Sequence, residues 1–144
     1  MTKKAYFRVL RAIVMLMLLS GILMPWFTLG FEPHPTPILW TGWEDIWNSG
    51  SLGSELIFKY GLDLYSIFLL LESLSGIFLL LYLIYNVFAL IKAYNGNKIF
   101  SILLIGVIAI LLFNSQSITI GVILFGFWLF IFSLLSFAII EWVN

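Results

Sequence analysis

Glu72 is the residue with the clearest potential for chemistry, because it is a carboxylic acid inside a long apolar stretch. A carboxylate inside a lipid bilayer is costly, and it often marks an ion path, a proton relay or the counter-ion of a ligand. At helical spacing Ser75, Tyr82 and Asn86 lie on or beside the face that carries Glu72, so the four side chains are candidates for a polar lining between helices. The alternative is that Glu72 lies at the outer membrane surface, bonded to the neighbouring loop or to water. The sequence favours this alternative, because we expect no Lys or Arg inside the membrane to pair with the acid.

The other residues that carry chemistry are few. His34 is the only histidine and lies between two prolines, whereas a metal or haem site needs several ligands. The chain has no cysteine, which excludes disulfides, thiolate metal sites and thiol catalysis. No nucleophile–base pair or phosphate-binding loop is recognisable. We therefore expect neither an enzyme nor a bound metal or cofactor.

The composition indicates that the solvent of this chain is lipid. Of its 144 residues 62% are hydrophobic and 10% are charged, whereas soluble domains carry roughly 25% charged residues. The length suits a single domain, residues 1–144. The net charge is zero and no long basic stretch is present, so we expect no nucleic-acid partner.

Four apolar segments predict an all-α integral membrane protein built as a four-helix bundle. A spanning helix needs about 20 apolar residues, and the segments are 12–31, 64–92, 97–114 and 118–141. The basic start followed by an apolar run is also typical of a signal peptide, but the run is long and its cleavage site is poor, so we expect it to be retained. Asp63 is placed to cap the second segment, and polar residues 114–117 suit a tight hairpin between the last two.

The loop of residues 32–63 is predicted to be structured, with one or two short helices at the membrane surface. Thr41 and Glu44 match the capping box that starts a helix, and residues 48–50 read as its end, so we expect a helix over 42–48. Ser54 is expected to cap a second short helix over 55–60, which ends before Gly61. Tryptophans are typical anchors at membrane interfaces, and the predicted anchors are Trp26, Trp40, Trp43, Trp47 and Trp142.

The basic residues predict the orientation. Six of the seven Lys and Arg lie at the N-terminus or at 92–98, whereas five of the seven acids lie in the 32–63 loop. The positive-inside rule then places both termini in the cytoplasm and the loop outside the cell membrane.

One resemblance concerns topology. A first helix that ends in Pro25-Trp26-Phe27, a polar loop with Gly and Trp and three further helices resemble the small four-span prokaryotic membrane proteins of unknown function. The large first loop is also similar to the claudin-like tetraspan arrangement, but that family's Gly-Leu-Trp motif and cysteine pair are absent. These resemblances imply a topology and assign no residue a role.

Two functions are expected from the sequence. The first is a non-catalytic subunit that packs against, assembles or stabilises a larger membrane complex or a homo-oligomer, with lipid and other membrane subunits, or further copies of itself, as partners. The alternative is a small channel, carrier or lipid- or quinone-binding protein with a polar lining around Glu72, Tyr82 and Asn86.

Overall fold

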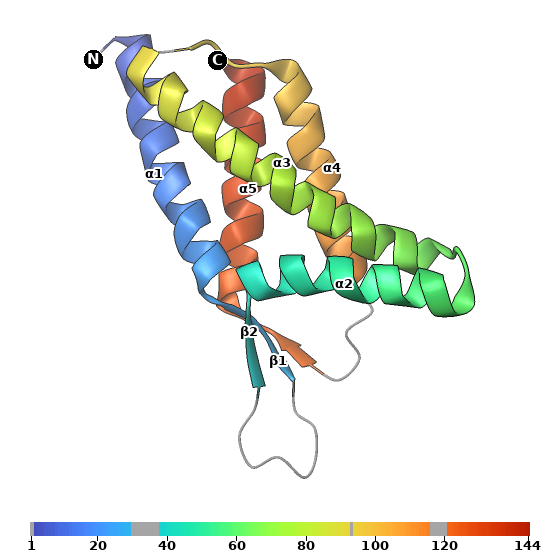
Figure 1. Cartoon of the computed structure of the whole chain (residues 1–144). Coiled ribbons are helices and arrows are strands. Elements are labelled where there is room, and N and C mark those ends of the chain that lie inside the picture. The colour runs from blue at the N-terminus through green and yellow to red at the C-terminus, as the bar shows by residue number, and fades with distance from the viewer. Residues whose placement is uncertain (1, 30–37, 93, 116–120) are drawn as a thin grey trace.

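Four long apolar helices form the body of the molecule in the computed structural model, which describes residues 2–29, 38–92, 94–115 and 121–144 (Figure 1). They are α1 (Lys3–Leu23), α3 (Leu64–Lys92), α4 (Lys98–Ser115) and α5 (Phe125–Val143), and each is long and apolar enough to cross a membrane. Both termini lie at the same end of the bundle (Figure 1). The prediction of a multi-pass helical membrane protein is confirmed at this level.

Local signals set the bounds of the second and third spans. The predicted span 64–92 is α3, and Asp63 caps it by accepting a hydrogen bond from the Ser66 amide at 2.7 Å. Helix α4 lies within one residue of its predicted range. These helices were predictable because their apolar runs end at polar residues.

Helix α2 (Gly42–Tyr60) lies across the end of the bundle opposite the termini (Figure 1). The capping box at Thr41 and Glu44 is present. Gly61, which has a φ of 84°, caps the C-terminal end of α2. The prediction of two short helices separated at residues 48–50 is wrong, because α2 continues through them. A Cβ at Gly50 would collide with the Ser73 side chain of α3. This glycine therefore allows close helix packing and does not stop the helix.

A three-stranded antiparallel sheet below the bundle was not predicted. Strands β1 (Pro25–Leu29), β2 (Ile38–Thr41) and β3 (Gly121–Ile123) lie in the order β2-β1-β3. Strands β1 and β3 occupy parts of the segments 12–31 and 118–141 that were read as spanning helix. Pro25 ends α1, since a proline cannot donate the helical hydrogen bond. The spans are correspondingly shorter at this end, and α1 instead begins at Lys3.

Trp26 is the centre of the packing between the sheet and the helices. Its side chain is fully buried, its Nε1 donates to the Gly21 carbonyl at 2.8 Å, and its ring packs on Phe127 and Phe130. The prediction that Trp26 anchors the chain at the interface is therefore wrong, because an anchor must expose its indole to the headgroups. Gly42 lies so close to the Trp26 ring that a Cβ there would overlap it.

Candidate functional site

Two polar clusters lie against different parts of α3. We call the first, in the last third of the helix, the ion-pair cluster: Arg11, Tyr82, Asn86 and Glu141. The second, in its first third, is the acid cluster: Asp45, Ser49, Glu72 and Asn114. The structure thus divides the predicted polar lining into two sites. Ser75 joins neither, since its hydroxyl donates to the Leu71 carbonyl at 2.7 Å.

The ion-pair cluster joins α1, α3 and α5. Arg11 Nη1 donates to Asn86 Oδ1 at 2.6 Å and to Glu141 Oε1 at 2.5 Å. The Tyr82 hydroxyl donates to the same carboxylate oxygen at 2.7 Å, and the Asn97 amide donates to Oε2 at 2.7 Å. Because Glu141 of α5 accepts bonds from α1, from α3 and from the Asn97 amide before α4, the cluster holds these segments together.

Sequence reasoning missed this ion pair. We expected no basic residue inside the bundle, and Arg11 was counted with the basic flank, yet only 2% of Arg11 is exposed. Glu141, at the end of the predicted span 118–141, is buried as well. One signal was present: Arg11 falls at helical spacing with Val14 and Leu18, the buried face of α1.

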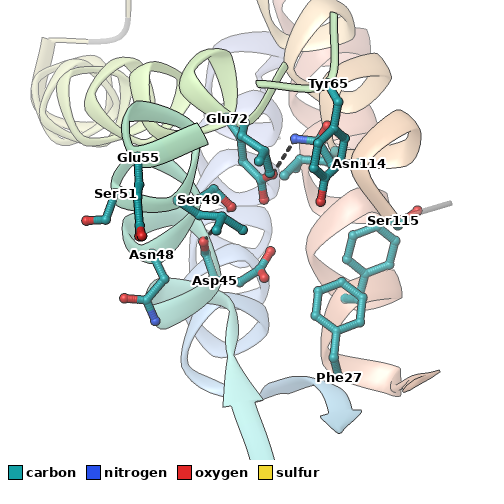
Figure 2. Close-up of a pocket in the computed structure, with 14 residues that line it drawn as sticks. Phe27, Asp45, Asn48, Ser49, Ser51, Glu55, Tyr65, Glu72, Asn114 and Ser115 are labelled. Carbon is teal, nitrogen blue, oxygen red and sulfur yellow. Dashed lines mark hydrogen bonds between the residues drawn. The ribbon is translucent and has the colours of Figure 1, made fainter. Parts of the chain in front are cut away.

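The acid cluster places two carboxyl groups next to each other. Only 2% of Glu72 is exposed; its side chain accepts a hydrogen bond from Asn114 Nδ2 of α4 and interacts directly with Asp45 of α2 (Figure 2). Ser49 lies beside Glu72, and its hydroxyl donates to the Asp45 backbone carbonyl at 2.8 Å. Glu72 therefore lies at the level of Asn114, near one end of the bundle, and its partners include the loop helix.

Burial raises the pKa of Asp45, and its hydrogen bond with Glu72 opposes that rise only in part. Two adjacent carboxyl groups, one buried (Glu72) and one half-buried (Asp45), disfavour ionisation of both, because the two negative charges would repel each other. The pair is therefore expected to hold one proton over a broad range around neutral pH and to carry a single negative charge.

A cavity of about 360 Å³ adjoins the acid cluster between α2, α3 and α4. Figure 2 shows Asp45, Ser49, Glu72 and Asn114 among the residues that line it, and Asn48, Ser51, Glu55 and Ser115 add further polar groups. Its apolar walls are Phe27, Leu52, Leu69, Leu111 and Phe127. The volume lies within the range of small-molecule sites, and apolar walls with a few convergent polar groups are typical of them.

The other predicted anchors whose side chains the structure describes are exposed on the surface of the molecule. Trp43 and Trp47 of α2 stack with ring centroids 6.3 Å apart, and 42% and 66% of them is exposed. Trp142 is exposed beneath the Lys98 ammonium, 5.0 Å from its ring centroid. Their role as interfacial anchors stays a prediction. The side chain of Trp40 and the whole of His34 lie outside the described residues.

Comparisons with models of protein families, with curated proteins and with solved structures find no match to this chain. The fold and the cavity define the class of protein. It is a helical membrane protein with four helices long and apolar enough to span a membrane. A fifth helix, α2, crosses one end of the bundle and lines a cavity together with the Asp45–Glu72 pair.

Proposed function

We propose that the protein is a non-catalytic membrane protein that binds an amphiphilic ligand in the cavity beneath α2. The observation that carries this proposal is the cavity of about 360 Å³, whose lining combines apolar side chains with the buried carboxyl group of Glu72 and the half-buried carboxyl group of Asp45. A hydrocarbon chain suits the walls, and a polar head that donates hydrogen bonds suits the carboxyl oxygens.

The cavity, and not the full polar face of α3, is the expected binding site. Tyr82 and Asn86 already bond within the ion-pair cluster, so they are not available to line a ligand path. Of the three residues predicted to form a polar lining, Glu72, Tyr82 and Asn86, only Glu72 therefore stays a candidate for contact with the ligand.

The test uses a blocked cavity and a matched control. Leu52 lines the cavity from α2 and is 45% exposed, so Leu52→Trp can fill the space without overpacking the core. Leu62 is 76% exposed and does not line it, which makes Leu62→Trp the control. After extraction in mild detergent, native mass spectrometry should find copurified amphiphile on the wild type and on Leu62→Trp, and much less on Leu52→Trp. Equal amphiphile on all three proteins would contradict the proposal.

A subunit role is the second candidate. A groove between α2 and α3, lined in part by Gly50, Ser51, Ser54 and Ser73, supports it, because small residues let another helix approach closely. Stoichiometric copurification of a second membrane protein would support the subunit role, and purification as a single species would count against it.

A further inference from the structure

Among the described residues that line the cavity, the charged groups leave one negative charge without a cation. From α2 come Asp45 and Glu55, and from α3 come Glu72 and the uncharged Tyr65. The Glu55 carboxylate is paired with Lys59 at 2.6 Å. Within the described residues, α4, α5 and β1 contribute only uncharged side chains to the lining. The Asp45–Glu72 pair is therefore the charge that a ligand meets.

We propose that the cavity selects amphiphiles with a single ammonium head, which binds the Asp45–Glu72 pair while the alkyl chain lies on the apolar walls. This inference rests on the ligand-binding function proposed above and adds the chemical class of the ligand. One positive charge matches the one negative charge of a pair that holds one proton.

The physical reason is that the buried negative charge lacks a cation among the described residues. A neutral head leaves that charge uncompensated, whereas an ammonium compensates it next to the buried Glu72 carboxyl group. A primary ammonium also has three N–H donors, and the acceptors that face it are the carboxyl oxygens and the lone pairs of the Ser49 hydroxyl. The apolar walls Leu69, Leu111 and Phe127 explain why the cation should carry an alkyl chain.

The selectivity should depend on pH in one direction. As the pH falls, a second proton neutralises the pair and removes the attraction for ammonium. Burial raises the pKa of Asp45, so this loss should begin at a higher pH than for an exposed aspartate, whose pKa is about 3.9. A primary amine stays charged below about pH 10. Acidification should therefore weaken amine binding through the protein alone.

The experiment compares octylamine with 1-octanol, which have the same chain and differ in the head. Isothermal titration calorimetry of the protein in lipid nanodiscs, with empty nanodiscs as the baseline, gives both affinities. We expect octylamine to bind about tenfold more tightly near neutral pH, since a hydrogen bond to a charged group is stronger than a neutral one. Near pH 4 we expect the two affinities to converge.

The double variant Asp45→Asn/Glu72→Gln removes the charge while keeping the shapes of both side chains. It should bind octylamine no better than 1-octanol, and unchanged 1-octanol binding shows that its cavity is intact. Asp63→Asn is the matched control, because Asn caps a helix about as well as Asp and Asp63 does not line the cavity. It should keep the tenfold preference.

The possible failures are distinct. Equal binding of both probes to the wild type overturns the ammonium selectivity and leaves the proposed binding function standing. An octylamine preference that survives in the double variant also overturns the selectivity. Binding of neither probe overturns the proposed function and the selectivity together.

Discussion

The ion-pair cluster allows a quantitative prediction about stability. Arg11→Met should remove two hydrogen bonds from Nη1 and leave the buried Glu141 carboxylate with the Tyr82 hydroxyl and the Asn97 amide. Glu141→Leu should leave the buried guanidinium with Asn86 as its remaining bonded partner in the cluster. Removing one member of a buried pair typically costs about 3–5 kcal/mol. We expect Arg11→Met near the lower value and Glu141→Leu near the upper one, because Glu141 accepts three bonds.

A double-mutant cycle separates this pairing from simple loss of packing. The double variant Arg11→Met/Glu141→Leu leaves no unpaired charge, so its loss should be smaller than the sum of the single losses by about 2 kcal/mol or more. The free energy of unfolding is measured by titration of mixed micelles with sodium dodecyl sulfate, followed by tryptophan fluorescence. The control is Arg8→Met: Arg8 is exposed and makes one bond to the Ile91 carbonyl, so it should cost less than about 1 kcal/mol. Additive single losses, or an Arg11→Met loss no larger than that of Arg8→Met, would refute the reasoning.

Three further predictions concern packing, capping and topology. Gly42→Ala should lower the free energy of unfolding by about 1–3 kcal/mol in the same titration, because the new methyl group overlaps the Trp26 ring, whereas Gly106→Ala, with open space around it, should not. Thr41→Ala should destabilise the start of α2 by about 1 kcal/mol, seen as faster amide exchange. Hydrogen bonds from Thr41 also hold the pKa of Glu44 below its usual value. The stabilisation from the ionised Glu44 is therefore present above the ordinary pKa of a glutamate and is lost as the pH falls through the lowered pKa of Glu44. A cysteine at Gln116 should react with an impermeant maleimide in intact cells and one at Thr2 should not, since both termini are expected in the cytoplasm; labelling at Thr2 would reverse the orientation.

Features encoded by neighbouring residues could be predicted from the sequence. The Thr41–Glu44 capping box and the Asp63 cap each depend on residues three positions apart. The range of α3 follows from an apolar run bounded by polar residues. Such signals are sufficient for the spans and for the start of α2, because they act within one or two turns of helix.

Features made by distant residues could not be predicted. Arg11 and Glu141 are 130 positions apart, and either one alone reads as an ordinary residue at the end of a span. The sheet was hidden because apolar residues of β1 and β3 extend the hydrophobic runs of their neighbouring helices. Glu72 stands out in the sequence, but its partner Asp45 becomes visible only in the structure, where α2 lies over α3.

The contrast between the two clusters indicates which of them binds a ligand. In the ion-pair cluster Arg11 and Glu141 neutralise each other, and the space beside Arg11 is only about 10 Å³, enough for about one water molecule. The acid cluster has a negative charge with no cation among the described lining residues, and it adjoins a cavity many times larger. Buried charge without a counter-charge is destabilising, so it is tolerated where a ligand can supply that counter-charge. Substitutions in the ion-pair cluster should consequently lower stability without changing the preference for octylamine, whereas substitutions in the acid pair should change the preference with little loss of stability.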